Sequence, residues 1–365
     1  MFTSGNDFGG SDTIIMNKRI IAIVYAVLAA LFYAINVPCS KVLLNDVAPT
    51  FMAGFLYIGA GLGVGVMYLF HFTKEPVEKR LKKEDTIYTV AMVLLDIAAP
   101  ILLMIGIKMG SAANASLLGN FEIVATTLIA FVVFKEAISM RLGVAIVFVT
   151  LASMILSFSG TNSFDFSIGS LLVLGATVCW GIENNCTRKI SDKSTYQIVV
   201  IKGICSGLGS VFIAMVIGET VPSLHKILLI MVLGYVAYGL SIFSYVRAQQ
   251  ILGAAKTSTY YAIAPFIGVL LSVILLKEKV TLSFAIALVV MMIGTILSVR
   301  DTLIFKHRHT HTHTITHTHD GSTHTHVIEH SHDHEHVIHD DVHGHHHPLE
   351  MLEKELNHGG TREIQ

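Results

Sequence analysis

The sequence carries little charge. Only 14% of its 365 residues are Asp, Glu, Lys or Arg, whereas 53% are apolar and the mean hydropathy is +0.64. Soluble domains contain about a quarter charged residues, so this composition excludes an ordinary soluble domain. The apolar residues also occur in blocks long enough to cross the core of a bilayer, which takes roughly 20 residues per helix. The sequence therefore predicts a polytopic membrane protein.

Three further features are scarce or missing. All four cysteines lie within apolar blocks, so we expect no disulfide framework. No G-x-x-x-x-G-K-[ST] phosphate-binding loop occurs, so ATP is not expected to drive the protein directly. No small-residue cleavage site accompanies the first apolar block, which we interpret as a retained helix and not as a signal peptide.

Ten apolar blocks separated by short loops predict an all-α protein with ten transmembrane helices. They lie near residues 20–40, 50–70, 87–107, 111–134, 142–159, 168–187, 196–217, 227–249, 257–276 and 282–300. Basic residues concentrate in alternate loops, most densely at Lys79, Arg80, Lys82 and Lys83. Basic loops stay on the cytoplasmic side. We therefore expect a multi-pass protein of the plasma membrane with both termini in the cytoplasm.

The chain repeats itself. "NFEIVATTLIAFVVFKE" (120–136) aligns with "AIAPFIGVLLSVILLKE" (262–278), and "YAINVPCSK" (33–41) aligns with "WGIENNCTR" (180–188). Each copy contains five predicted helices, and an odd number of crossings forces the second copy to be inverted relative to the first. Inverted repeats of this kind are typical of alternating-access transporters, whose site lies at midplane between the copies.

These residues carry a family resemblance. Two five-helix halves, each ending its fourth helix in a Lys-Glu pair (Lys135-Glu136 and Lys277-Glu278), resemble the EamA-type family of the drug/metabolite transporter superfamily. The resemblance covers roughly residues 18 to 300 and implies a transporter, not an enzyme. Members move amino acids, nucleotide sugars, drugs and other metabolites, so the substrate stays open. The second span, "MAGFLYIGAGLG" (52–63), departs from the common pattern because it lacks an arginine.

The expected organisation has four parts. They are an N-terminal segment (1–17), two five-helix repeats (18–159 and 160–306) and a histidine-rich, disordered cytoplasmic tail (307–365). The expected partners are a small-molecule substrate and the lipid bilayer, with no nucleic acid. A homodimer is left open, and no cofactor is required.

Two carboxylates occur in the middle of apolar spans. Asp96 is central in the third span and Glu122 in the fourth. An intramembrane charge is costly, so such residues normally face a cavity or a partner. Pro100 lacks an N–H and frees the carbonyl of residue 96. We predict that both acids bind a proton or a cationic group, with a buried, protonated, hydrogen-bonded carboxyl as the alternative.

Other polar residues of the spans fall into two groups. Glu183 and Lys202 are predicted at the same depth in adjacent helices, which suggests an ion pair that is either structural or a gate. The predicted cavity residues also include Asn36, Tyr238, Ser241 and Tyr261. For a single tyrosine, a packing role is the competing interpretation.

Histidines dominate the tail. Neutral imidazoles at His-x-His spacing can bind Zn²⁺ or Ni²⁺. The candidate ligands are His309, His311, His313, His317, His319, His324, His326, His330, His332, His334, His336, His345, His346 and His347.

Three function classes stay open. The first is a secondary transporter of a small organic metabolite or drug, with proton coupling as an option. The second is a divalent-metal transporter or metal-regulated permease whose tail acts as sensor or buffer, and a membrane-anchored metal store is a third. The spans contain no central histidine, because His71 and His225 lie at helix ends. We therefore favour the organic solute.

Overall fold

A computed structural model describes most of the chain. The described residues are 8–70, 76–135, 138–158, 167–190, 192–252, 257, 260–302, 304–319, 322–337 and 361–364. They divide into a helical unit, Met1–Val299, and a smaller unit, Arg300–Gln365.

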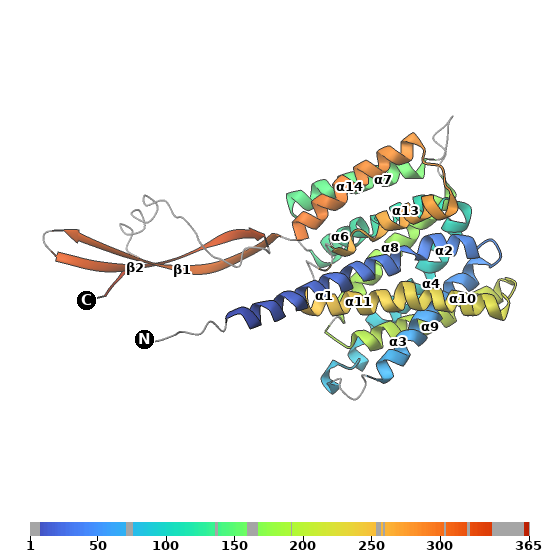
Figure 1. Cartoon of the computed structure of the whole chain (residues 1–365), viewed down its shortest axis with the longest axis horizontal. Helices are drawn as coiled ribbons and strands as arrows, with labels where there is room; N and C mark the ends of the chain where they lie inside the picture. The colour runs from blue at the N-terminus through green and yellow to red at the C-terminus, as the bar shows by residue number, and fades with distance from the viewer. Residues whose placement is uncertain are drawn as a thin grey trace. The chain divides into compact units, whose positions relative to one another are not determined.

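The helical unit is a bundle (Figure 1). The first repeat forms α1 (Phe8–Ala34), α2 (Asn36–Leu43), α3 (Pro49–Leu69), α4 (Thr86–Met109), α5 (Ala112–Leu118), α6 (Phe121–Phe134) and α7 (Met140–Ser157), with short 3-10 turns at Val77–Lys79 and Lys83–Asp85. The second repeat forms α8 (Ile168–Lys189), α9 (Thr195–Val216), α10 (Leu224–Gly234), the π-helical segment η4 (Tyr235–Leu240), α11 (Ser241–Leu252), α13 (Ala264–Leu276) and α14 (Leu282–Thr302).

Each of the ten expected spans corresponds to helix in the described chain. Eight helical stretches of that part are long and apolar enough to cross a membrane. The sixth span, α8, is long enough but is made more polar by residues such as Glu183 and Arg188. In the ninth span, α13 has 13 residues. The structure thus agrees with a multi-pass helical membrane protein.

Several spans are broken where the sequence predicted continuous helices. α1 ends at Ala34, whose carbonyl would bond the N–H that Pro38 lacks. Pro265 stands in the first turn of α13 and has the same effect on the residues before it. The fourth span turns at Gly119 and Asn120, between α5 and α6. In the eighth span the π-helical segment η4 interrupts α10–α11. Residues at three of these breaks, Ala34, Asn120 and Pro265, line the same cavity.

The packing of the helices obeys the internal repeat. α4, from the third span, packs on α8, from the sixth, and α11, from the eighth, packs on α1, from the first. Exchanging the two repeats converts each of these pairs into the other. Likewise α6 contacts α8 and α13 contacts α1. Lys135 and Lys277, which align in the repeat, both end their helices with left-handed backbone (φ 55° and 53°).

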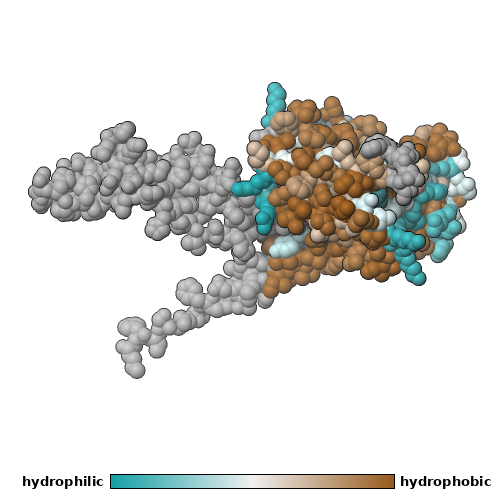
Figure 2. Space-filling view, turned by 90° about the horizontal axis from the view of Figure 1, so that it is seen from above, coloured by the Kyte–Doolittle hydropathy of each residue, from teal (hydrophilic) through white to brown (hydrophobic). Residues whose placement is uncertain are grey.

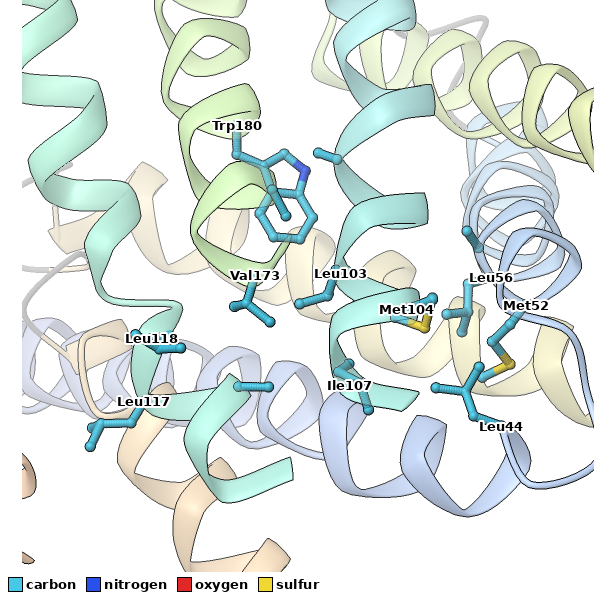
Figure 3. Close-up of a cluster of buried hydrophobic side chains, with 14 of the residues drawn as sticks. Leu44, Met52, Leu56, Leu103, Met104, Ile107, Leu117, Leu118, Val173 and Trp180 are labelled. Carbon is cyan, nitrogen blue, oxygen red and sulfur yellow. The ribbon is translucent and has the colours of Figure 1, made fainter. Parts of the chain in front are cut away.

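The outside of the helical unit is apolar. Exposed large hydrophobic residues occur on nearly every long helix, and Figure 2 shows them covering most of the visible face, with hydrophilic residues gathered toward its ends. The inside is packed around one large cluster of buried hydrophobic residues, and Figure 3 shows part of it, with Leu103 of α4 beside Val173 of α8 near the Trp180 ring. An apolar exterior of this kind suits a bilayer.

The smaller unit contains three strands. β1 (Ile304–His319) pairs antiparallel with β2 (Ser322–Val337), and β2 pairs with β3 (Thr361–Ile364). The sequence interpretation of a disordered tail therefore differs from the structure in these ranges. The reason is the alternation of histidine with Thr, Val and Ile, because β-branched residues favour extended backbone. His345, His346 and His347 lie outside the described residues.

Glycines bring α3 and α9 into close contact. A Cβ added to Gly203 of α9 would lie 2.5 Å from the Cα of Gly61 on α3, and one on Gly207 would lie 2.8 Å from the carbonyl oxygen of Gly54. Small residues let helix backbones approach closely in membranes, where packing stabilises helix association. In the run "GAGLGVG" of α3, Gly59, Gly61 and Gly63 all lie against a neighbouring helix, whereas Gly65 has only Val200 within 4 Å.

We expect Gly203→Ala to destabilise the protein by roughly 1–3 kcal/mol, because its methyl group would overlap backbone that cannot move aside cheaply. The matched control is Gly65→Ala, whose methyl group would meet Val200 at an ordinary 3.8 Å. The control should melt at or above the wild-type temperature, since Ala is the better helix former. Thermal unfolding in detergent measures both, and equal melting of the two variants would contradict the close-contact assignment.

Candidate functional site

Two adjoining cavities lie where the two repeats meet. Their volumes are about 320 and 220 Å³. Both are lined by Tyr33 and Glu122 of the first repeat and by Trp180 and Tyr261 of the second. Since the shared walls come equally from both copies, we treat the two as one central cavity. This is where inverted-repeat transporters place their substrate site.

Lys202 of α9 lies between two buried carboxylates. Its Nζ is 3.1 Å from Oδ2 of Asp96 on α4 and 3.1 Å from Oε1 of Glu183 on α8. These distances follow from the packing of α4 against both α8 and α9. The sequence indicated the Glu183–Lys202 pair, and the structure brings these two residues together with Asp96 as a third member. We call the three residues the ion cluster.

The members of the ion cluster differ in their access to the cavity. Glu183 and Lys202 line its smaller part, whereas Asp96 is fully buried and lines neither part. The Tyr57 hydroxyl donates to Oδ1 of Asp96 at 3.1 Å, and Nε1 of Trp180 donates to the same hydroxyl at 3.4 Å. Asp96 therefore lies behind Tyr57 and Lys202. It does not lie on the cavity wall, contrary to the prediction from the sequence.

Glu122 is a carboxylate of the cavity wall itself. It lies in the first turn of α6, directly after the break at Asn120. Asn184 of α8 donates from Nδ2 to Oε1 of Glu122 at 2.6 Å and contacts the Thr126 hydroxyl at 3.4 Å. Within the described part of the chain Glu122 forms no ion pair with a lysine or arginine. Its partner is a neutral amide, so the charge of this carboxylate is left for a ligand or a proton to balance.

The other half of the site is neutral. The repeat aligns Tyr238 with Asp96 and Asn36 with Glu183. Nδ2 of Asn36 donates to the Tyr238 hydroxyl at 2.9 Å, and Ser40 donates to the Asn36 oxygen at 3.2 Å. The residues equivalent to the two acids thus meet across the repeats as an uncharged pair. The central cavity is consequently charged on one side of the repeat axis and neutral on the other.

Aromatic rings complete the wall. The Tyr33 ring centroid lies 6.0 Å from that of Tyr238 and 5.8 Å from that of Tyr261, and Tyr245 lies 5.3 Å from Tyr261. Ser241, which lines the smaller part of the cavity, donates to the Ala29 carbonyl at 2.9 Å. Tyr238 belongs to the π-helical segment η4, and such segments are frequent at functional sites. The predicted residues Tyr238, Ser241 and Tyr261 therefore gather at one cavity.

Tyr57 and Trp180 were not among the residues predicted from the sequence. A signal for Trp180 was present, because the only tryptophan of the chain aligns with Tyr33 in the internal repeat. Tyr33 and Trp180 both line the larger part of the cavity, one from each copy. Tyr57 had no comparable signal, since a tyrosine in an apolar span does not show which neighbour its hydroxyl will reach.

The charges of the site do not balance. Asp96, Glu122 and Glu183 are three carboxyl groups, and Lys202 is the one amine that reaches the ion cluster in the described chain. Burial without a partner disfavours a charge, so a proton or a cationic ligand is expected to complete the balance. Among the described residues no group of three His, Cys, Asp or Glu side chains is arranged for a metal ion.

The Lys-Glu signature of the second repeat has a local structural role. Glu278 accepts hydrogen bonds from the backbone N–H groups of Ala112 and Ala113, at 2.7 and 2.8 Å, at the start of α5. Lys41 donates to the carbonyls of Ile107 and Gly110, at 2.6 and 2.5 Å, at the end of α4. Charges of these signs stabilise helix ends. The two residues thus hold the connection between α4 and α5 in place.

Removing the amine of the ion cluster should lower the stability of the protein. We expect Lys202→Met to destabilise the protein by roughly 3–5 kcal/mol, because two buried carboxylates lose their partner. Adding Asp96→Asn and Glu183→Gln should recover most of this loss, since neutral amides need no counter-charge. Lys226→Met, which breaks the exposed pair with Asp46, is the control and should change stability by less than about 1 kcal/mol. If Lys202→Met unfolds like this control, the cluster does not hold the three helices.

Comparison with known proteins also indicates a membrane transporter. The EamA-like transporter family model matches residues 20–158 and 167–300. An uncharacterized transporter of Methanothermobacter thermautotrophicus is 24% identical over 76% of this chain and 85% of its own length. The uncharacterized transporter YyaM of Bacillus subtilis is 21% identical over 58% and 73%. A solved crystal structure shares the fold, with a TM-score of 0.56 and 15% identity over 76% of this chain and 95% of its own. The chain belongs to the EamA-like transporter family and is a multi-pass membrane transporter.

Proposed function

We propose that the protein is a secondary transporter that moves a small organic solute carrying a positively charged amine. The single observation that carries this proposal is Glu122, a carboxylate in the central cavity whose described partner is the Asn184 amide and not a cation. An amine of the solute would supply the missing positive charge.

The rest of the cavity supports an amine with an apolar or aromatic body. Val37, Leu103 and Val173 line the larger part, together with the rings of Tyr33 and Tyr261. Ligand sites of about 300–1,000 Å³ with apolar walls and a few placed polar groups are the usual kind for small molecules, and the larger part has about 320 Å³. Tyrosine and tryptophan faces also attract cations.

The helix breaks support a rocking movement around this site. Glu122 follows the break between α5 and α6, and Asn36 follows the break between α1 and α2. A change of angle at these points would move the carboxylate relative to the opposite repeat. Discontinuous helices at the substrate site are a general feature of alternating-access transporters.

Proton exchange at Glu122 would couple the movement to a gradient. A proton would neutralise the carboxylate when the solute is absent, and the solute amine would displace that proton on binding. Asp96 and Glu183 keep Lys202 as their partner and serve as the fixed, structural part of the site. We further propose a plasma-membrane location with both termini in the cytoplasm, from the basic residues of the loops. The metal-cargo alternative is less well supported, because no histidine is among the described residues that line the cavity.

Three ligands that share one body test the charge preference. Phenethylamine, 2-phenylethanol and phenylacetate differ only in the group that would face Glu122. Ligands that bind the native state raise the melting temperature by mass action. We expect phenethylamine to stabilise the purified protein more than the alcohol does, and phenylacetate to have no effect. Stabilisation by phenylacetate but not by phenethylamine would overturn the proposed substrate class.

We expect Glu122→Gln to abolish both the stabilisation by phenethylamine and any proton release on its binding, because the amide keeps the shape but not the charge. Glu122→Asp should retain part of each. The matched control is Glu84→Gln, which removes an exposed carboxylate from the 3-10 turn Lys83–Asp85 and should behave as wild type. Proteoliposomes with a pH-sensitive dye inside report the proton movement. A Glu122→Gln protein that still exchanges protons for phenethylamine would show that Glu122 is not the coupling group.

A further inference from the structure

The strand pairing of the tail places all of its strand histidines on one face. Residues directly opposite each other in an antiparallel pair lie on the same face, and successive residues alternate between faces. The histidines of β1 have odd numbers and those of β2 have even numbers, and the register pairs odd with even throughout. The residues concerned are His307, His309, His311, His313, His317, His319, His324, His326, His330, His332, His334 and His336.

Eight of these residues form directly opposite pairs. His307 is paired with His334, His309 with His332, His311 with His330, and His317 with His324. Opposite positions are about 4.5–5.5 Å apart, and neighbours on the same face of a strand are about 6.6 Å apart. The first three pairs follow one another without interruption. They form a ladder of six imidazole-bearing positions.

The opposite face of β1 and β2 explains why this register is favoured. It pairs Lys306 with Glu335 and Arg308 with Asp333. Oppositely charged residues at facing positions stabilise a strand pair. A shift of the register by one residue would separate these charges and would also put the histidines of the two strands on different faces.

We propose that the histidine face of the β1–β2 hairpin is a binding site for divalent transition metals, with Zn²⁺ as its simplest ligand. Zinc takes four ligands in tetrahedral geometry, and neutral imidazole is among its preferred ones. Two consecutive pairs, such as His307, His309, His332 and His334, supply four imidazoles. A second group near the turn has His317, His319, His324 and His326. This site shares no residue with the lining of the central cavity and does not depend on the proposed transport of an amine.

The placement of the histidines on one face can be tested with variants that keep the composition of the tail unchanged. In the face-changing variant His309 is exchanged with Thr310 and His311 with Thr312, so two histidines move to the other face while composition and length stay the same. In the control variant His313 is exchanged with Ile315, and both positions lie on the histidine face. Calorimetry with Zn²⁺ on the purified full-length protein measures the affinity.

We expect the face-changing variant to bind Zn²⁺ at least about tenfold more weakly than wild type, because even a displaced supporting group costs a metal site 10–100-fold. The control variant should bind within about twofold of wild type. Hydrogen exchange of tail peptides gives a second measurement, since Zn²⁺ should protect backbone amides of β1 and β2 in the wild type and the control. Equal Zn²⁺ affinity of the two exchanged proteins, or no Zn²⁺ binding by the wild type, would overturn the proposal.

Discussion

The buried amine of Lys202 is the constraint on which the site depends. Its two contacts, each 3.1 Å, tie α9 to α4 and α8. A lone charge in the membrane interior is costly, so Lys202 needs both carboxylates and they need it. Asp96 is further held by Tyr57 and, through it, by Trp180. One ion cluster therefore orients the tyrosine and the tryptophan that form the cavity wall.

The internal duplication explains why charge occurs on one side of the cavity only. In one copy the positions are Asp96 and Asn36, and in the other they are Tyr238 and Glu183. The contacts cross the repeats, so the two acids meet each other through Lys202 while Asn36 meets Tyr238 directly. An inverted repeat with identical sequences would carry the same charges twice. Here the two halves have the same fold but different electrostatics, so the two sides of the cavity differ in charge.

The membrane spans could be predicted from the hydropathy of the sequence, and the internal repeat from an alignment of the chain with itself. The Glu183–Lys202 pair was readable because an isolated charge in an apolar helix needs a partner at the same depth. The position of Asp96 behind Tyr57 could not be predicted, since the direction in which a helix face points depends on the rotation of three packed helices. The hairpin of the tail was missed for a different reason. Alternating His and Thr has no apolar period, but a strand needs only extended residues and a partner with a matching register.

Alternating access of the central cavity is the main claim, and the solvent exposure of one residue tests it most directly. Ser116 lines the larger part of the cavity and is 6% exposed. Ser116→Cys, in a protein whose four native cysteines are replaced by alanine, can be treated with a membrane-impermeant maleimide in vesicles of either orientation. Labelling from both sides of the membrane, slowed by a bound amine, is the predicted result. Labelling that is confined to one side under every condition of pH and ligand would contradict the account.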